Sequence, residues 1–191
     1  HIIAEALNKG FDVSVSTRPS SVTAHLKAFD INYISINFAD ATAIKKQLEA
    51  GQYNYIIHAA GITKANNQEE YNLVNAVYTA NFAQAASVAN IPLKKFVFMS
   101  SLAAVGPSVD SGMIDENNQF LPVTEYGKSK MLAEQMLESV EKLPLIIIRP
   151  TAVYGPREKD ILIILKTISR GLEPYIGNKP QMLSFIYVKD L

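Results

Sequence analysis

Short apolar runs alternate with longer amphipathic segments along most of this chain. The apolar runs cover residues 11–17, 32–38, 53–61, 94–101 and 143–150. Several of them end in small or polar residues, as buried parallel strands do. The spacing of apolar side chains between the runs predicts helices over about 42–50, 68–89, 125–140 and 159–170. This alternation predicts an α/β fold with a doubly wound parallel sheet and helices on both of its faces.

The composition argues against several kinds of binding partner and site. The chain has 18 basic and 18 acidic residues and lacks the basic excess of a general binder of nucleic acid or membrane surfaces, so we expect neither partner. It has no cysteine, which excludes disulfides and thiolate metal sites and fits a reducing compartment such as the cytoplasm. His1 and His25 are isolated in the sequence, so no metal site is predicted.

A tyrosine and a lysine stand four residues apart at the start of the helix predicted over 125–140. Tyr126 and Lys130 would therefore lie one turn apart on the same helix face. An ammonium group near a phenol favours the phenolate, and a tyrosine so tuned can pass a proton to or from a substrate oxygen. Upstream, Ser100 and Ser101 end a buried strand, at the edge where parallel sheets bind ligands.

The same residues also have a structural interpretation. Ser100 and Ser101 could simply cap their strand, and the Tyr126–Lys130 pair could be a solvated helix surface. A second Tyr-x-x-x-Lys match, Tyr175–Lys179, contains glycine and asparagine and is followed by proline, so it predicts a turn. The pair alone therefore does not decide between an active site and an ordinary surface.

The chain resembles the extended short-chain dehydrogenase/reductases, the NAD-dependent epimerase/dehydratase family. Four segments occur in the family's order: HAAG (58–61), SSLAAVG (100–106), YGKSK (126–130) and RPTAVYGP (149–156). FIYVKDL (185–191) looks like a fifth. The resemblance runs along nearly all 191 residues, and the ordered set is far more specific than any one segment.

The resemblance implies a Rossmann-type sheet and a role for each matching residue. Tyr126 would be the general acid/base, and Lys130 would lower its pKa and hydrogen-bond the nicotinamide ribose. Ser101 would hydrogen-bond the reacting oxygen of the substrate, which Tyr126 also contacts. Hydride would move between the carbon of that group and nicotinamide C4.

The resemblance also implies where the cofactor lies. Ala59, Ala60 and Gly61 would bring backbone close to it, and Pro150 and Val153 would line the nicotinamide. The glycine-rich turn that opens the family is absent from the sequence, so we expect the first strand and its loop to be missing ahead of residue 1. Residues 1–150 would then be an incomplete dinucleotide-binding domain, and 151–191 the start of a mostly absent substrate-binding part.

The end of the apolar run at residues 11–17, which matches the second strand of the family, bears on cofactor choice. NAD-preferring members place an acidic residue there, whereas this chain has Thr17 followed by Arg18. A guanidinium can pair with a 2′-phosphate, so NADP is favoured over NAD, with Arg18, Ser20 and Ser21 as contacts. Asn37 stands where the family places an aspartate near the adenine, and its amide oxygen can still accept a hydrogen bond.

Two departures from the family bear on the reaction. Leu102 and Ala103 follow Ser101, where sugar-nucleotide dehydratases carry an acidic pair, and neither can move a proton. Ala152 stands three residues after Arg149, where nucleotide-sugar members tend to carry an asparagine. These departures favour a reductase or dehydrogenase that interconverts a secondary alcohol and a ketone, on a small alcohol, ketone or sugar-like substrate.

Two other functions remain open at this stage. One is a nucleotide-sugar epimerase that keeps its NAD, and the other is a non-catalytic dinucleotide-binding protein. The resemblance further implies a homodimer formed through the long helix and the Tyr126 helix. His58 is interpreted as a packing residue at a strand end rather than a base or ligand, and Asn75 as a structural residue near the active site.

Overall fold

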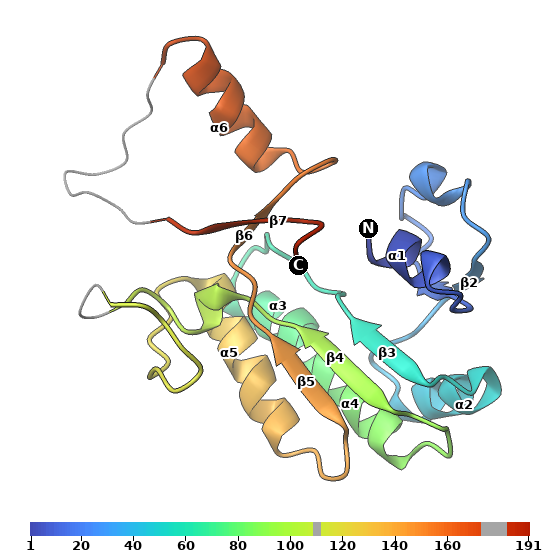
Figure 1. The fold of residues 1–191 in the computed structure, drawn as a ribbon. Coiled ribbons are helices and arrows are strands. Elements are labelled where there is room, and N and C mark those ends of the chain that lie inside the picture. Colours follow the sequence, from blue (N-terminus) through green and yellow to red (C-terminus); the bar gives the residue numbers. More distant parts are fainter. Residues whose placement is uncertain (109–111, 173–182) are drawn as a thin grey trace. The chain divides into compact units, whose positions relative to one another are not determined.

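The structure is a computed structural model that describes residues 1–108, 112–172 and 183–191 (Figure 1). The second tyrosine–lysine match, Tyr175–Lys179, lies outside these residues. The chain divides into two units: a larger one, residues 2–149, and a smaller one formed by residues 150–191 with His1. This division lies next to the boundary expected after residue 150. The roles expected of the two parts stay predictions.

All the strand pairings among the described residues are parallel. In the larger unit, β3 (Tyr55–His58), β4 (Lys95–Met99) and β5 (Leu145–Ile148) form one sheet in that order. A separate sheet pairs β1 (Ser14–Ser16) with β2 (Asn32–Ile34). In the smaller unit, β6 (Ala152–Tyr154) pairs with β7 (Phe185–Tyr187). The predicted α/β class with parallel strands is confirmed. The described strands form three separate sheets rather than the single sheet that was predicted. In the larger unit, no described strand joins β1 to β3.

The helices fall close to the segments that the apolar spacing predicts. The larger unit contains α1 (Ile2–Asn8), the 3₁₀ turn η1 (Ala24–Leu26), α2 (Ala41–Gly51), α3 (Gln68–Asn72), the π-helical segment η2 (Leu73–Val77), α4 (Tyr78–Val88), the 3₁₀ turn η3 (Leu102–Ala104) and α5 (Glu125–Glu138). The smaller unit contains α6 (Asp160–Ser169). Side chains that accept a first-turn backbone N–H precede several of these elements, among them Asp40 before α2, Asn67 before α3 and Thr124 before α5.

The helix predicted over 68–89 is interrupted in its middle. Its hydrogen-bond pattern changes from α to π at Leu73–Val77 and back to α at Tyr78. Such π segments are rare, and they are frequent at functional sites. Asn75, which lies within this segment, is fully buried. The sequence pattern predicted the length of the helix but not this interruption.

Among the described residues, helices pack against only one face of the three-stranded sheet. Alternate strand residues, including Phe96 and Phe98, are fully buried in a core that they share with residues of α4 and α5. Figure 1 shows these two helices behind the sheet. Ile57 and Ile146 point the other way and are 47% and 39% exposed. The expectation of helices on both faces is therefore met on one face.

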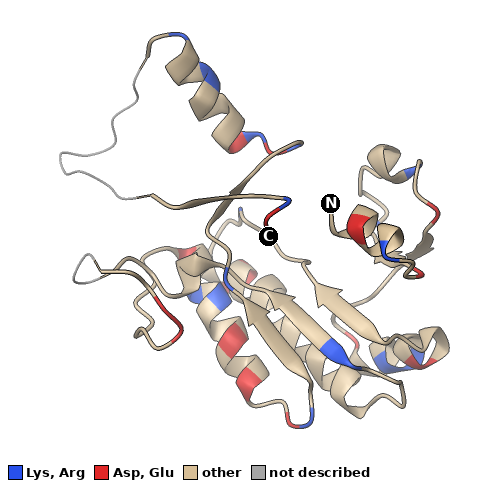
Figure 2. Ribbon diagram, viewed as in Figure 1, with Lys and Arg blue, Asp and Glu red and all other residues tan. Residues whose placement is uncertain are grey.

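The surface of the larger unit mixes charges of both signs. Figure 2 shows acidic and basic residues interspersed along the ribbon, with both signs present on α5. None of the helices in the described residues has both the length and the apolar character needed to cross a membrane.

Candidate active site

Ser101 stands at the carboxyl end of β4, where it begins the 3₁₀ turn η3. Its backbone is extended, and its Oγ accepts a hydrogen bond from the Ala103 N–H at 3.2 Å. The hydroxyl therefore keeps its own proton available for another acceptor. It also lies close enough to the Tyr126 phenol to lower the pKa of that phenol. The strand end and the turn thus place Ser101 beside the first turn of α5.

Close packing of α5 on η3 brings Tyr126 to this position. Gly127 is buried, and a Cβ added to it would lie 2.2 Å from the carbonyl oxygen of Ala103. A larger residue could not occupy this position without separating the helix from the turn. The glycine after Tyr126 is therefore what allows α5 to approach the residues that follow Ser101.

Lys130 lies one turn further along α5 and is only 5% exposed. Its Nζ donates a hydrogen bond to the carbonyl oxygen of Met99 at 2.9 Å. The same nitrogen is 4.8 Å from the ring centroid of Phe98 and 5.9 Å from that of Tyr126, distances at which a cation interacts with an aromatic ring. Ser101, Tyr126 and Lys130 are therefore brought together, although their roles stay predictions.

Burial dominates the electrostatics of this pair. It raises the pKa of Tyr126, the nearby Ser101 hydroxyl opposes that shift, and nearby Tyr71 adds to it. Burial also lowers the pKa of Lys130 to about 8, against the opposing charge of Glu134. The downward pKa shift expected for Tyr126 is therefore wrong for the protein by itself. The reason is that desolvation of the phenol is the largest effect, while Lys130 donates to a backbone carbonyl.

Asn75 connects the loop after β3 to the helix that carries the tyrosine. Its Oδ1 accepts from the Ile62 N–H at 2.8 Å, and its Nδ2 donates to the Ile62 carbonyl at 2.9 Å and to Ser129 Oγ at 3.0 Å. Ser129 in turn donates to the Tyr126 carbonyl at 2.7 Å. This agrees with the interpretation of Asn75 as a structural residue. Sequence reasoning missed Ser129, whose only signal was its place between Tyr126 and Lys130.

The loop expected to approach the cofactor lies directly after β3. Ala59, Ala60 and Gly61 are all exposed there. A Cβ added to Gly61 would lie 2.9 Å from Asn75 Oδ1 and 3.7 Å from Lys130 Nζ, so this backbone passes close to the lysine. An exposed backbone of small residues beside an ammonium group fits the close approach of a dinucleotide.

The residues expected to select the cofactor lie at the ends of β1 and β2. The Arg18 side chain is exposed, and its backbone N–H donates to Ser21 Oγ at 3.0 Å, which shapes the turn that contains Ser20. The Thr17 N–H pairs with the carbonyl of Ile34 at 3.0 Å. Asn37 Oδ1 accepts from the Ala39 N–H at 3.2 Å.

The remaining two predicted cofactor contacts, Pro150 and Val153, belong to the smaller unit. Pro150 is half-buried and directly follows Arg149, while Val153 lies in the middle of β6 and pairs with Ile186 of β7. Each is thus placed within its own unit, and a contact with nicotinamide stays a prediction.

His58 is buried among aromatic rings at the end of β3. Its Nε2 lies 2.9 Å from Thr79 Oγ1, and its ring stacks on Phe98 with 5.9 Å between centroids. Burial, with the charge of Lys130, lowers the pKa of His58 to about 3. A neutral imidazole with its contacts inside the core supports a packing role.

Sequence reasoning also missed a buried carboxylate next to this site. Glu134 is 1% exposed and accepts hydrogen bonds from the Ser100 hydroxyl and from Arg149. The signal for it was an acidic residue one turn beyond Lys130, next to the apolar residues of α5 that enter the core. The Ser100 hydroxyl thus bonds a side chain of α5 instead of capping its own strand.

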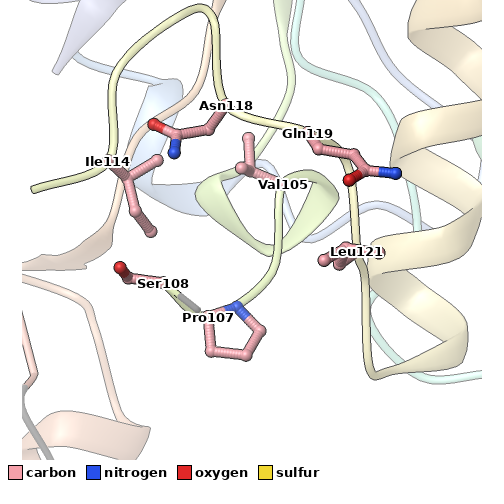
Figure 3. Close-up of a pocket in the computed structure, with 7 residues that line it drawn as sticks. All are labelled: Val105, Pro107, Ser108, Ile114, Asn118, Gln119 and Leu121. Carbon is pink, nitrogen blue, oxygen red and sulfur yellow. The ribbon is translucent and has the colours of Figure 1, made fainter. Parts of the chain in front are cut away.

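A cavity of about 260 Å³ lies in the loop between η3 and α5, and Figure 3 shows the residues that line it. They are Val105, Pro107, Ser108, Ile114, Asn118, Gln119 and Leu121. The predicted catalytic and cofactor residues do not line it. In residues 1–108, 112–172 and 183–191, no group of three or more histidine, aspartate or glutamate side chains is placed to hold a metal.

Comparison with curated proteins finds relatives with several activities. The chain is 24% identical over 190 residues to the ceramide reductase of Caulobacter vibrioides, a match that covers 100% of this chain and 54% of that protein. It is 29% identical over 151 residues to the UDP-glucose 4-epimerase of Vibrio cholerae, covering 71% of this chain and 45% of the relative. The chain spans about half the length of the curated relatives it matches.

Comparison with solved structures establishes the fold. The Bordetella bronchiseptica enzyme WbmG, in complex with NAD and UDP, matches with a TM-score of 0.81 at 21% identity over 99% of this chain and 61% of that one. The Bacillus cereus UDP-glucuronic acid 4-epimerase, in complex with NAD, matches with a TM-score of 0.78 at 22% identity over 99% of this chain and 66% of that one. The model of the NAD dependent epimerase/dehydratase family matches residues 1–191. The chain belongs to the NAD dependent epimerase/dehydratase family, a family of enzymes with a Rossmann-type α/β fold.

Proposed function

We propose that this chain carries the catalytic residues of an NAD(P)-dependent oxidoreductase that interconverts a secondary alcohol and a ketone. The observation that supports this most is the meeting of Ser101, Tyr126 and Lys130 at the carboxyl end of β4. Two helical elements and a strand end bring these side chains together, and Lys130 is 5% exposed. A solvated surface helix would not bury an ammonium group at this point.

The geometry suits reduction of a carbonyl group. Burial raises the pKa of Tyr126, so the phenol holds its proton and can donate it from Oη to the reacting oxygen. The Ser101 hydroxyl orients that oxygen by a second hydrogen bond. Nicotinamide, when bound, supplies or accepts the hydride at the carbon. In the oxidation direction Tyr126 takes the alcohol proton, and the nearby Lys130 ammonium favours the phenolate that forms.

NADP is the favoured cofactor in this proposal. The support is the exposed Arg18, whose position after β1 carries no carboxylate that would repel a 2′-phosphate. The solved neighbours WbmG and the Bacillus cereus epimerase are both complexes with NAD. A direct comparison of KM for NADH and NADPH decides between the two cofactors.

The residues after Ser101 argue against a dehydration step. Leu102 and Ala103 form the start of η3, and neither side chain can donate or accept a proton. The chain is 28% identical over 170 residues to the human dTDP-D-glucose 4,6-dehydratase, so the sequence likeness by itself does not exclude that reaction. The match to a ceramide reductase, which covers 100% of this chain, supports the simple redox step on a ketone.

A nucleotide-sugar epimerase is the second candidate. Its support is the set of solved neighbours, among them the Thermotoga maritima UDP-glucose 4-epimerase with UDP-glucose, which matches 100% of this chain with a TM-score of 0.80. An epimerase would use the same Ser101 and Tyr126 twice, and it would show no net consumption of nicotinamide. A non-catalytic dinucleotide-binding protein is disfavoured, because it would have no chemical need for all three site residues.

The test separates these functions by their products. The purified full-length protein is assayed with NADPH and NADH against a panel of ketones, and with UDP-glucose by product analysis. Net oxidation of NAD(P)H supports the oxidoreductase, whereas conversion of UDP-glucose to UDP-galactose without net redox overturns it in favour of the epimerase. Tyr126→Phe should lower turnover at least about 100-fold, and an unchanged rate would show that Tyr126 is not the general acid/base.

We also propose that the protein is a homodimer that pairs the surface of the η2 segment and α5. Leu73 and Val77 of η2 are apolar and exposed to 44% and 36%. Size-exclusion chromatography with light scattering measures the mass directly. Replacing both residues by glutamate should shift a dimer to a monomer, and a protein that is monomeric from the start contradicts this part of the proposal.

A further inference from the structure

Glu134 carries a carboxylate that three segments of the larger unit surround. Its Oε1 accepts a hydrogen bond from the Ser100 hydroxyl, at the end of β4. Arg149, just beyond β5, donates to its Oε2 from Nε at 3.0 Å and from Nη2 at 2.8 Å. The Arg149 guanidinium also lies over the Phe120 ring, 4.7 Å from its centroid. The carboxylate of Glu134 therefore joins α5 to the ends of both β4 and β5.

Stability alone is a weak explanation for this arrangement. Burying a carboxylate and a guanidinium costs desolvation energy, which their attraction offsets only when the geometry is good. Apolar residues of similar volume often serve a core equally well or better. Glu134 is 1% exposed and Arg149 keeps a side-chain exposure of 20%, so the core would lose little by an apolar replacement. What an apolar pair could not do is hold the Ser100 hydroxyl.

Consecutive residues at the end of β4 attach to side chains of α5. The Met99 carbonyl accepts from Lys130, and Ser100 donates to Glu134 one turn later. The hydroxyl of the next residue, Ser101, lies close enough to Tyr126, on the preceding turn, to lower the pKa of its phenol. Because Ser100 and Ser101 are adjacent in the chain, the point at which Ser100 is held limits where the Ser101 hydroxyl can lie.

We propose that Glu134 is a positioning residue, which anchors Ser100 and thereby sets the Ser101 hydroxyl against the Tyr126 phenol. This inference rests on the proposed oxidoreductase function, in which Ser101 and Tyr126 share the reacting oxygen. A displacement of about 1 Å at such a site is enough to cost a large part of the rate. Glu134 itself touches neither the substrate nor the cofactor in this scheme.

The charge of Glu134 has a second effect, on Lys130. The titratable groups that face Lys130 are Tyr126 and Glu134 from its own helix and His58 from β3, with Arg149 behind Glu134. His58 is neutral near pH 7, because its pKa is about 3. Glu134 is therefore the anion among them that favours the charged form of Lys130, against the burial that lowers its pKa.

The first test uses Ser100→Ala, which removes the anchored hydroxyl and leaves the Glu134–Arg149 pair in place. We expect kcat to fall at least about tenfold while KM for the ketone changes less than about twofold. Ser100→Thr keeps a hydroxyl and should restore most of kcat. A crystal structure of Ser100→Ala should show Ser101 Oγ displaced from Tyr126 Oη. A wild-type kcat, or a lower kcat with Ser101 unmoved, would overturn the proposal.

The second test needs no activity. Lysine labelled with ¹³C at Cε is titrated by NMR, with Lys130→Met to assign the signal. In Glu134→Gln the pKa of Lys130 should fall by at least about half a unit, whereas the matched exposed variant Glu138→Gln should leave it unchanged. An equal pKa in Glu134→Gln and wild type would overturn the electrostatic effect.

These readouts separate the two proposals. If the wild-type protein turns over neither ketones nor nucleotide sugars, the proposed function fails, and the crystal structure and the lysine titration still decide the role of Glu134. If Glu134→Gln does not fold, the Ser100→Ala and Ser100→Thr pair decides the positioning by itself, because both variants keep the buried ion pair.

Discussion

Lys130 donates a hydrogen bond to the carbonyl oxygen of Met99 at 2.9 Å, so a side chain of α5 holds the last residue of β4. This contact helps to explain how a lysine can be only 5% exposed, because it gives the buried ammonium a hydrogen-bond acceptor. It also places the ammonium between the loop after β3 and the ring of Tyr126. The site is therefore built by tying a helix to a strand end.

Lys130→Met should stabilise the protein while it removes activity. Burial lowers the pKa of Lys130 from 10.5 to about 8, which corresponds to roughly 3 kcal/mol of cost for its charged form. Loss of the Met99 hydrogen bond offsets part of this, so we expect a gain of about 1 kcal/mol in unfolding free energy at pH 7. Urea unfolding measures it, with exposed Lys128→Met as the control.

The lowered pKa of Lys130 also predicts that the stability of the protein depends on pH. Between about pH 8 and 10.5 the unfolded chain binds the Lys130 proton more tightly than the folded protein does, so wild-type stability rises relative to Lys130→Met as pH increases. A difference between the two proteins that stays constant over this window contradicts the buried-charge explanation.

Gly127→Ala should destabilise the protein by about 1–3 kcal/mol. The added Cβ would lie 2.2 Å from the Ala103 carbonyl oxygen, so α5 and η3 must separate. The same separation moves Tyr126 from Ser101, and turnover should fall as well. Lys128→Ala, at an exposed position of the same helix turn, should change neither quantity. Urea midpoints and kcat of the two variants provide the comparison.

His58 should make the protein sensitive to acid. Its pKa is about 3 in the folded protein and 6.5 ordinarily, so the unfolded chain takes up the proton first as pH falls. The stability that neutral His58 contributes is complete above pH 6.5 and is lost as pH falls toward about 3, by roughly 5 kcal/mol. Unfolding free energies of wild type and His58→Gln should therefore converge with acidification, and parallel curves would show that His58 does not carry this effect.

Arg18→Ala should weaken NADPH binding selectively. If the guanidinium pairs with the 2′-phosphate, KM for NADPH should rise at least about tenfold while KM for NADH changes little. Lys27→Ala, an exposed cation on the same stretch of chain, is the matched control and should affect neither cofactor. Equal changes in KM for both cofactors in Arg18→Ala would mean that Arg18 does not bind the 2′-phosphate.

Local pattern was enough for much of the fold. Apolar spacing placed α5 and its Tyr126–Lys130 pair within two residues of the observed helix end, because a helical repeat is written directly in the sequence. The strand that ends before Ser100 was equally clear. The break of the long helix into a π segment around Asn75 was not, because it depends on contacts with Ile62 and Ser129 from distant parts of the chain.

By itself, the sequence determined the α/β class, the parallel strands and the three residues that meet at the candidate site, because local spacing and ordered motifs encode these. Only the tertiary structure decided the electrostatics. Burial moves the pKa of Tyr126 upward, opposite to expectation, and Glu134 reaches both Ser100 and Arg149. Desolvation and contacts between segments far apart in the chain arise from packing, and no local pattern records them.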